Sequence, residues 1–296
     1  MPKTIEVCIA GAGPAGIAAA IQLKRYGISP VLLEKDTVGG LLINANLVEN
    51  YPGFPGGLTG KQLVRKFRKH LEVSGIEVIK ETLLGIDFEG GNFSLRTDQN
   101  NYSSRLVVLA TGTKPKKIRL AGLDQVLGKY AFHEVYPIMK VKNKRIAIIG
   151  AGDAAFDYAL NLGRHNEVSI NNRGRKFSCL PLLYERTQIS PNIKYRTNYN
   201  LTELSVKNEE LGLKWESGGG KSEEVVHFLL IAVGRVPGMG YLDSLEESQL
   251  SELRSKGLLY MIGDLANGRF RQASIAAGEG IKTAMLVYEK LKEFGE

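Results

Sequence analysis

Near the start of the chain, a glycine-rich turn lies between an apolar run and a helical segment. Residues 5–10 have strand character, Gly11-Ala-Gly13-Pro-Ala-Gly16 follows, and residues 17–25 have the spacing of a helix. A second apolar run, 31–33, ends in Glu34. Strand, G-x-G-x-x-G turn, helix, strand and acid follow one another in the order of a dinucleotide-binding βαβ unit. This feature predicts an α/β fold with a parallel sheet.

Each part of this turn has a physical role. Gly11 permits the tight turn, Gly13 lets the backbone approach a pyrophosphate, and Gly16 lets the helix pack closely on the strand. Free N–H groups and the positive end of the helix dipole face the phosphates. Glu34 can accept hydrogen bonds from a ribose diol and would repel a 2′-phosphate. We therefore expect FAD or NAD at this first site, and not NADP.

The same pattern returns at Gly150, 139 positions after Gly11. Residues 146–149 form an apolar run, Gly150-Ala-Gly152-Asp-Ala-Ala155 forms the turn, and a helical segment continues to about Leu162. Alanine in place of the third glycine is a tolerated variant of the motif. This internal repeat predicts a second nucleotide site in the same chain.

The second site differs from the first where its second strand ends. Residues 167–170 form that strand, and no acid follows it. Arg173, Arg175 and Lys176 cluster there instead. Because a basic cluster suits a 2′-phosphate and an acid suits a free 2′-hydroxyl, the second site favours NADPH over NADH.

The remaining segments continue the α/β pattern, with helical spacing at 59–74 and 273–291 and a continuous apolar strand at 106–110. Residues 217–222 have the composition of an exposed hairpin turn. Further strands are expected at 76–79, 84–88, 92–95, 225–233 and 257–262.

Composition limits the class of protein. The chain has 296 residues, 43% of them apolar, and a net charge of +8. No apolar run reaches the ~18 residues of a membrane span, and the N-terminus enters a strand with no signal-peptide pattern. We therefore expect a soluble, cytoplasmic protein. The positive charge favours acidic partners such as nucleotides or an acidic electron carrier, and a solvated basic surface is the alternative.

Two further classes of site have no support in the sequence. No nucleic-acid-binding motif is visible, so we expect no nucleic-acid partner. His70, His165 and His227 have no second ligand at metal spacing, so we expect no metal site.

The two cysteines, Cys8 and Cys179, lie far apart in the sequence. Cys8 falls in the first expected strand, where a cysteine is usually a small buried hydrophobe. No C-x-x-C sequence occurs, so neither a zinc knuckle nor a vicinal redox dithiol can form locally.

Several motifs together resemble the low-molecular-weight thioredoxin reductase family. In addition to the two glycine turns and Glu34, they include Asn50-Tyr-Pro-Gly53, and Gly263-Asp264 followed by Arg271-Gln-Ala273. The resemblance covers almost the whole chain. It implies two Rossmann-like, doubly wound α/β domains. A discontinuous FAD domain would comprise residues 1–113 and 231–296, with an NAD(P)H domain, 114–230, inserted between them.

The resemblance also implies which residues hold the cofactors. Asp264 would contact the ribitol or phosphate region of FAD, and Arg271, Gln272 and Ala273 would border its ring, where a helix dipole can stabilise the reduced anionic form. The full FAD set is Gly11, Gly13, Pro14, Ala15, Gly16, Glu34, Lys35, Gly40, Leu41, Asn50, Ala110, Thr111, Gly112, Asp264, Arg271, Gln272 and Ala273. The NAD(P)H set is Gly150, Gly152, Asp153, Ala154, Ala155, Arg173, Arg175, Lys176 and Gly234. Family members are commonly homodimers.

The chain departs from the family pattern at the redox dithiol. Counting back from Gly150, the family's two cysteine positions hold His133 and Tyr136 here. His133 is therefore a candidate proton donor or acceptor near the flavin; alternatively, both side chains only fill the space of the lost dithiol. Without a dithiol, the chain would not act as a thioredoxin reductase by itself.

A second departure concerns the nicotinamide nucleotide. The family motif His-Arg-Arg-x-x-Phe-Arg corresponds here to residues 172–178, Asn-Arg-Gly-Arg-Lys-Phe-Ser, in which two of the three arginines are missing. Arg175 or Lys176 can compensate for them. Loss of nicotinamide use is the alternative.

These features predict an FAD-dependent NAD(P)H oxidoreductase that passes electrons directly to an external acceptor. The candidate acceptors are a ferredoxin-like carrier, a quinone, a dye or oxygen, and dithiol-free members of the wider group resemble ferredoxin–NADP reductases. One alternative is a cysteine-independent disulfide reductase that uses the flavin directly. Another is a flavoprotein that no longer uses NAD(P)H and either takes electrons from another donor or acts as a sensor.

Overall fold

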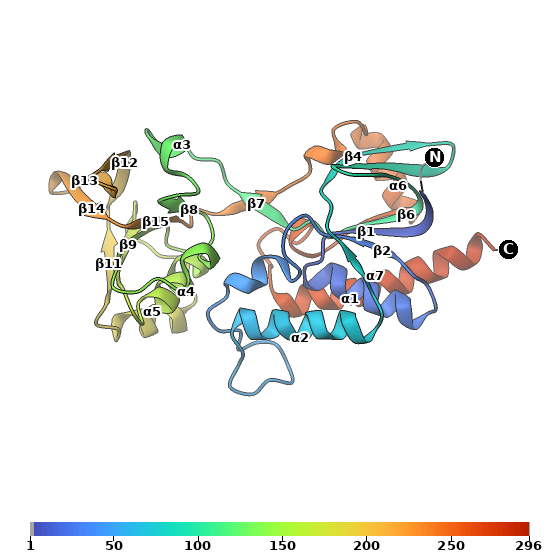
Figure 1. Cartoon of the computed structure of the whole chain (residues 1–296), viewed down its shortest axis with the longest axis horizontal. Coiled ribbons are helices and arrows are strands. Elements are labelled where there is room, and N and C mark those ends of the chain that lie inside the picture. The colour runs from blue at the N-terminus through green and yellow to red at the C-terminus, as the bar shows by residue number, and fades with distance from the viewer. Residues whose placement is uncertain (1–2, 296) are drawn as a thin grey trace. The chain divides into compact units, whose positions relative to one another are not determined.

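The computed structural model describes residues 3–295, and it divides into two compact units (Figure 1). Unit 1 comprises Met1–Ile43, Val48–Lys114 and Val236–Glu296, and unit 2 comprises Asn44–Leu47 and Pro115–Arg235. Two short strands at the connections pair with each other, β7 (Thr113–Pro115) and β16 (Arg235–Pro237). Which cofactor each unit holds stays a prediction.

Unit 1 is built on a seven-stranded sheet in the order β3-β2-β1-β6-β5-β4, with β17 also paired to β6. The pairs of β1, β2, β3, β6 and β17 are parallel, and β4 and β5 extend the sheet in antiparallel pairing. The strands are β1 (Lys3–Ala10), β2 (Val31–Leu33), β3 (Val78–Ile79), β4 (Leu83–Glu89), β5 (Asn92–Thr97), β6 (Asn101–Leu109) and β17 (Leu259–Met261). Residues 106–109 of β6 are fully buried, as the continuous apolar run predicted.

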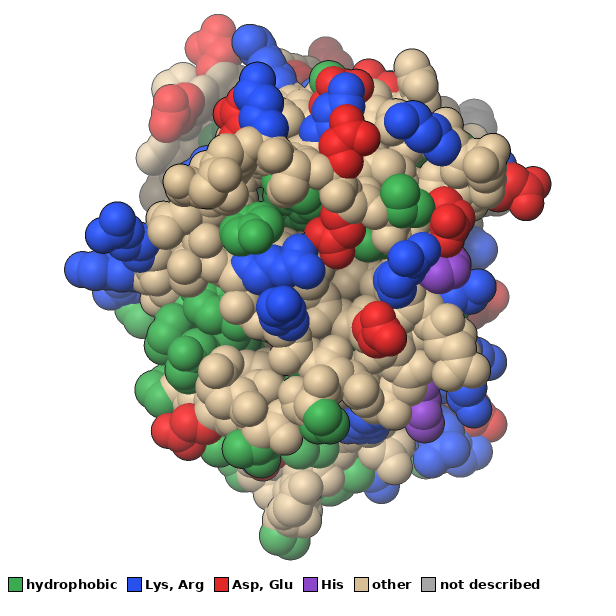
Figure 2. All heavy atoms as spheres, turned by 90° about the vertical axis from the view of Figure 1, so that its left-hand side faces the viewer, with side chains coloured by type: hydrophobic (Ala, Val, Ile, Leu, Met, Phe, Trp, Pro, Cys, Tyr) green, Lys and Arg blue, Asp and Glu red, His purple; other side chains and the backbone are tan. Residues whose placement is uncertain are grey.

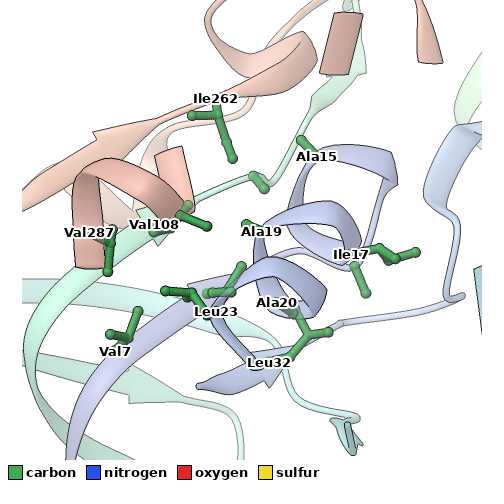
Figure 3. Close-up of a cluster of buried hydrophobic side chains, with 14 of the residues drawn as sticks. Val7, Ala15, Ile17, Ala19, Ala20, Leu23, Leu32, Val108, Ile262 and Val287 are labelled. Carbon is green, nitrogen blue, oxygen red and sulfur yellow. The ribbon is translucent and has the colours of Figure 1, made fainter. Parts of the chain in front are cut away.

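Three long helices lie on one face of this sheet (Figure 1). They are α1 (Pro14–Arg25), α2 (Gly60–Val73) and α7 (Ala273–Glu293). Figure 3 shows α1 side chains such as Ile17 and Leu23 in one buried cluster with strand residues and with Val287 of α7. Helix α6 (Glu247–Ser255) contributes Leu253 to a second cluster, which also contains Cys8. Short 3₁₀ turns complete the unit: η1 (Gly40–Asn44), η3 (Gly240–Leu242) and η4 (Gly263–Leu265).

Local sequence explains where these helices begin. Proline occupies the first position of α1, where its missing N–H is not needed. Thr59 caps α2: its hydroxyl accepts from the Gln62 N–H at 3.2 Å, while the Gln62 side chain accepts from the Thr59 N–H at 2.9 Å. This reciprocal pair is a capping box.

Unit 2 combines a parallel and an antiparallel sheet. The parallel sheet has the order β11-β10-β9-β15-β8, and the antiparallel sheet has the order β12-β13-β14. The strands are β8 (Ala131–Phe132), β9 (Arg145–Ile149), β10 (Glu167–Asn172), β11 (Ile193–Thr197), β12 (Asn200–Lys207), β13 (Glu210–Ser217), β14 (Gly220–Val226) and β15 (Phe228–Ile231). The hairpin turn expected at 217–222 joins β13 to β14.

The helices of unit 2 are α3 (Leu123–Val126), α4 (Asp153–Leu162) and α5 (Pro181–Gln188), with a 3₁₀ turn η2 (Tyr136–Ile138). Phe156 and Leu162 of α4 are buried in one cluster with the parallel strands. Trp215 and Leu204 of the antiparallel sheet are buried in another. The parallel sheet of unit 2 is therefore packed on two faces, as in a doubly wound fold.

One expected strand is wrong. Residues 225–233 do not form a single strand, because β14 ends at Val226 and β15 begins at Phe228. Between them, the His227 N–H donates to the carbonyl oxygen of Arg145 at 2.9 Å, and the His227 Nδ1 accepts from the Arg145 N–H at 3.1 Å. The chain leaves the antiparallel sheet and enters the parallel sheet at this residue. Both strands carry apolar residues, so hydropathy did not reveal the change of partner.

Within residues 3–295, no helix has both the length and the apolar character needed to cross a membrane. The same residues contain no group of three or more side chains arranged to hold a metal ion.

Candidate functional site

The first glycine turn connects β1 to α1 and packs against the end of β6. A Cβ atom added to Gly11 would lie 2.4 Å from the carbonyl oxygen of Ala110, and one added to Gly16 would lie 1.9 Å from that of Gly11. Gly11 also has a φ of +105°, which side chains disfavour. Packing of the turn itself therefore requires both glycines.

Gly13 is different, because packing does not require it. Its backbone is extended, with φ −77° and ψ −178°, and an added Cβ would meet no heavy atom within 4 Å. Gly13 is the N-cap of α1, and no side chain caps the helix there. The turn leaves open space before the first N–H groups of α1, where a pyrophosphate binds in turns of this type. The residues of this turn therefore fit FAD.

Glu34 fixes the other side of the turn. It follows β2 and is 9% exposed. Its Oε2 accepts from the Ala12 N–H at 2.8 Å, and its Oε1 accepts from the Asp36 N–H at 3.0 Å. A carboxylate has about four acceptor positions, so two bonds leave room for ribose hydroxyls.

Two further parts of the predicted FAD set border the turn. The Gly39 N–H donates to the Ala12 carbonyl oxygen at 2.7 Å, and a Cβ added to Gly40 would lie 3.6 Å from the Gly13 Cα. On the other side, a Cβ added to Gly263 would lie 2.9 Å from the Ala15 Cβ, so η4, which contains Asp264, packs on α1. Gly39 and Gly40 are each 27 residues from their partners in the turn, and Gly263 is 248 residues from Ala15, so only the fold brings these segments together.

Other members of the FAD set lie in separate contacts. The Asn50 side chain donates to the Gln272 side chain at 2.9 Å, which joins the loop after η1 to the start of α7. Thr111 shares a hydrogen bond of 2.5 Å with the Tyr241 hydroxyl. Lys35 is exposed.

Unit 2 repeats the first turn in detail. A Cβ added to Gly150 would lie 2.3 Å from the Ala232 carbonyl oxygen, as Gly11 does with Ala110. Gly152 is the uncapped N-cap of α4 with φ −99° and ψ 179°, and an added Cβ would meet only the Ser178 hydroxyl, at 3.6 Å. As in the first turn, packing requires the first glycine, Gly150, and does not require the glycine at the helix start, Gly152. This turn therefore also fits a dinucleotide.

A segment after β10 covers the second turn. The Ser178 N–H donates to the Ala151 carbonyl oxygen at 2.8 Å, and Asp153 accepts from the Leu180 N–H at 2.8 Å. Arg173, Arg175 and Lys176 lie before this segment and are exposed. Across the described part of the chain, no ion pair involves any of these three cations. Three neighbouring cations without a carboxylate suit a phosphate ligand.

His133 and Tyr136 lie between β8 and the first residue of η2. The His133 Nδ1 is buried and has no hydrogen-bond partner among the described residues. Tyr136 is 46% exposed, and its N–H donates to the Asn44 side chain at 3.0 Å. No described contact joins the two side chains to each other, so a shared chemical role stays a prediction.

Sequence reasoning missed an ion pair beside His133. The carboxylate of Glu134 lies 2.6 Å from the guanidinium of Arg235, and both side chains are partly exposed, at 31% and 23%. Burial raises the pKa of Tyr158 nearby; the Glu134 carboxylate adds to this rise and the Arg235 cation opposes it. The two charges are 101 positions apart, and only the adjacency of Arg235 to Gly234 could have suggested the pair.

Asp157 of α4 is a second residue that the sequence patterns did not single out. It accepts from the Asn46 N–H at 2.8 Å, while Arg164 donates to the Asn46 side chain at 2.7 Å. Burial raises the pKa of Asp157 to about 6, against the opposing effect of the Asn46 and Leu47 N–H groups. The segment 44–47 is therefore held on unit 2 by a titratable carboxyl group.

Two glycine turns with open helix starts, one beside a carboxylate and one beside three cations, define a protein that binds two dinucleotides. Residues 5–280 match the family described as pyridine nucleotide-disulphide oxidoreductase, and the chain belongs to that family.

Within this family, the similar proteins are thioredoxin reductases. The chain is 31% identical to mitochondrial thioredoxin reductase 1 of Arabidopsis thaliana, over 98% of this chain and 84% of that protein. It is 27% identical to thioredoxin reductase of Bacillus subtilis, over 99% and 97% of the two chains. A solved thioredoxin reductase from Lactococcus lactis superposes with a TM-score of 0.88 at 25% identity, over 98% and 99% of the two chains. The chain is thus a thioredoxin reductase-like flavoprotein oxidoreductase, with FAD and NADPH as the cofactors of its class.

Proposed function

We propose that this protein is an NADPH-dependent flavoprotein reductase that delivers electrons to an external acceptor without a dithiol of its own. The observation that carries the proposal is the state of its cysteines. Cys8 is 0% exposed in the core of unit 1, and Cys179 is 8% exposed in the core of unit 2. Burial raises the pKa of Cys8 to about 12, with a further rise from Glu81. Neither thiol suits a disulfide-exchange relay.

The chemistry is supplied by the cofactors and the positioning by the chain. When bound, FAD would supply the two-electron chemistry between NADPH and an acceptor. Gly13 and the helix start of α1 would hold the FAD pyrophosphate, and Glu34 its ribose. Gly152 and α4 would hold the NADPH pyrophosphate, with the three cations after β10 at its 2′-phosphate.

For the acceptor, we favour a small acidic electron carrier, with a quinone, a dye or oxygen as further candidates. The net charge of +8 supports this choice, because opposite charge raises the rate of encounter. We further propose that the protein is cytoplasmic and that it forms a homodimer, as members of the thioredoxin reductase family commonly do.

The disulphide chemistry in the family's description supports a second candidate. Here reduced flavin would act directly on a small-molecule disulfide, so that NADPH, a proton and the disulfide give NADP⁺ and two thiols. His133 would then be the proton donor to the departing thiolate, since its buried Nδ1 has no hydrogen-bond partner in the described structure.

An anaerobic titration tests the first step. The purified yellow protein receives stoichiometric NADPH or NADH, and we expect rapid bleaching of the flavin absorption band with NADPH. If neither nucleotide bleaches a flavin that dithionite can reduce, the proposal is wrong and another donor or a sensing role takes its place.

Acceptor assays test the second step. We expect NADPH oxidation with a dye, a quinone or ferredoxin, and no thioredoxin reduction, both in the wild type and in a Cys8→Ser/Cys179→Ser double variant. Thioredoxin reduction that disappears in the double variant would show that the chain's own thiols act. NADPH-dependent loss of a small disulfide that the double variant retains would favour the second candidate.

A further inference from the structure

Asn172 is the last residue of β10, and both the nitrogen and the oxygen of its side-chain amide form hydrogen bonds with the turn that follows. Its Nδ2 donates to the Lys176 carbonyl oxygen and to the Tyr195 hydroxyl, both at 2.9 Å. Its Oδ1 accepts from the Gly174 N–H at 3.0 Å. The side chain is 6% exposed. Both amide hydrogens are used, and the reversed amide would set its oxygen against the Lys176 carbonyl, so the contacts define its orientation.

The main chain ties the same turn from its other side. The Tyr199 N–H donates to the Asn172 carbonyl oxygen at 3.0 Å, and the Asn198 N–H donates to the Gly174 carbonyl oxygen at 3.1 Å. The Tyr195 hydroxyl accepts from the Asn172 amide, and the Tyr195 ring packs against Phe156 of α4 with ring centres 5.4 Å apart. Residues 173–176 are therefore fixed to β11 and, through Tyr195, to the helix of the second glycine turn.

The equivalent residue of unit 1 behaves differently. Glu34 directly follows β2, whereas Asn172 is the last residue of β10. The Glu34 carboxylate reaches back to the glycine turn and accepts from the Ala12 N–H at 2.8 Å. Asn172 instead reaches forward: its two amide hydrogens go to the Lys176 carbonyl oxygen and to the Tyr195 hydroxyl, and its oxygen accepts from the Gly174 N–H. Unlike Glu34, it carries no negative charge that would repel a 2′-phosphate. Arg173, Arg175 and Lys176 supply the positive charge in this turn that suits such a phosphate.

We propose that Asn172 is a positioning residue for nucleotides that carry a 2′-phosphate. It does not touch the nucleotide. Through the main chain of Gly174 and Lys176, it holds three exposed cations together at the end of β10. This inference rests on the proposed use of NADPH, and it explains how the chain can favour a 2′-phosphate although two arginines of the family motif are missing.

An amide is the side chain this position requires, because it must donate twice and accept once. Asn172→Leu is similar in shape and neutral, and it leaves the Gly174 N–H and the Lys176 carbonyl unbonded. Tyr195→Phe removes only one of the three bonds. Asn192→Leu is the matched control, since the one described hydrogen bond of the Asn192 side chain goes to the Gly163 carbonyl oxygen, at 3.0 Å, outside the turn.

Calorimetric titration of the FAD-loaded, full-length protein with 2′,5′-ADP and with 5′-AMP provides a readout that is independent of activity. We expect Asn172→Leu to weaken 2′,5′-ADP binding about tenfold and 5′-AMP binding by less than about twofold, because each lost hydrogen bond weakens the order of the turn. Tyr195→Phe should weaken 2′,5′-ADP binding about threefold, and Asn192→Leu should change neither ligand.

Three results would overturn the inference: an equal loss for both ligands, no loss for either, or a wild type that binds 5′-AMP as tightly as 2′,5′-ADP. If Asn172→Leu does not fold, as judged by circular dichroism and thermal unfolding, Tyr195→Phe decides in its place. An unchanged ratio of the two affinities in that variant would equally reject the positioning role.

Flavin reduction separates this inference from the proposed function. If NADPH reduces the flavin of the wild type, and Asn172→Leu leaves the preference for 2′,5′-ADP unchanged, the inference is rejected and the proposed function stands. If neither NADPH nor NADH reduces the flavin of the wild type, but the preference for 2′,5′-ADP disappears in Asn172→Leu, the proposed function is rejected and the inference is supported.

Discussion

The two cysteines show how burial controls the chemistry of a single residue. The thiolate is the reactive form of cysteine, and burial raises the pKa of both thiols, with Glu81 adding to the effect at Cys8 and Asp153 at Cys179. We predict that a chromogenic disulfide reagent labels neither thiol quickly in the native protein at pH 8. Two thiols per chain should react after unfolding in denaturant. Rapid labelling of the native protein would contradict this account.

Asp157 gives a pH dependence of stability. Burial raises its folded pKa to about 6 from an ordinary value of 3.8, so the folded protein binds this proton more tightly than the unfolded chain does. The stabilisation is therefore full below pH 3.8 and decreases as the pH rises from there to about 6. Relative to Asp157→Asn, the wild type should lose on the order of 1–3 kcal/mol over this range.

The measurement is the difference in melting temperature between wild type and Asp157→Asn as a function of pH. Asn keeps an oxygen that can accept from the Asn46 N–H, so the contact itself is retained. Glu185→Gln, at an exposed carboxyl of the same unit, serves as the control. Melting curves of wild type and Asp157→Asn that shift in parallel with pH would count against a raised pKa at Asp157.

At the scale of the element, the start of α1 contains one glycine that folding requires, Gly16, and one that we expect FAD binding to require, Gly13. An alanine at position 16 would bring its Cβ to 1.9 Å from the Gly11 oxygen, so α1 must move. Gly16→Ala should destabilise unit 1 by about 1–3 kcal/mol or more.

In Gly13→Ala, the added Cβ meets no heavy atom within 4 Å, so this variant should fold normally. It should bind FAD at least about tenfold more weakly, because the methyl group occupies the space of the pyrophosphate.

The two variants control each other in thermal unfolding and FAD titration. A Gly13→Ala protein that binds FAD as tightly as the wild type would refute the proposed pyrophosphate position.

Helix α4 allows the same test for the second nucleotide. Gly152→Ala should retain the fold and the FAD content of the wild type, because the added Cβ meets only Ser178 at 3.6 Å. Its dissociation constant for NADPH should rise about tenfold. Loss of FAD from this variant, or unchanged NADPH affinity, would show that the second turn has another role.

Some elements could be predicted and others could not. Strands β1 and β10 and helices α1, α4 and α7 were found because apolar periodicity and glycine signals agree in them. Strands β11 and β12 and helices α5 and α6 were not found. In β11, for example, Ile193 and Tyr195 alternate with Lys194 and Arg196, which is typical of a strand, but the strand has only 5 residues and contains no continuous apolar run.

At the scale of the whole molecule, charge is the property that bears on a partner. The net charge is +8, but on the face shown in Figure 2 the basic and acidic side chains are interspersed. We predict that electron transfer to an acidic carrier slows as ionic strength rises, because the Debye length shortens to about 8 Å at 0.15 M salt. Reduction of a neutral quinone by the same preparation should stay constant. A carrier rate that does not change with salt would argue against an acidic protein partner.

The sequence by itself determined the α/β class, the two repeated turns and the residues that end each nucleotide strand, because these depend on local spacing and local backbone geometry. Tertiary structure decided which glycines are free of packing, since that depends on the carbonyl oxygens of Ala110 and Ala232 from distant strands. It also decided that Asn172 shapes the basic turn while Glu34 supports its glycine turn. A side chain's hydrogen-bond partners follow from chain segments that meet only in the folded protein.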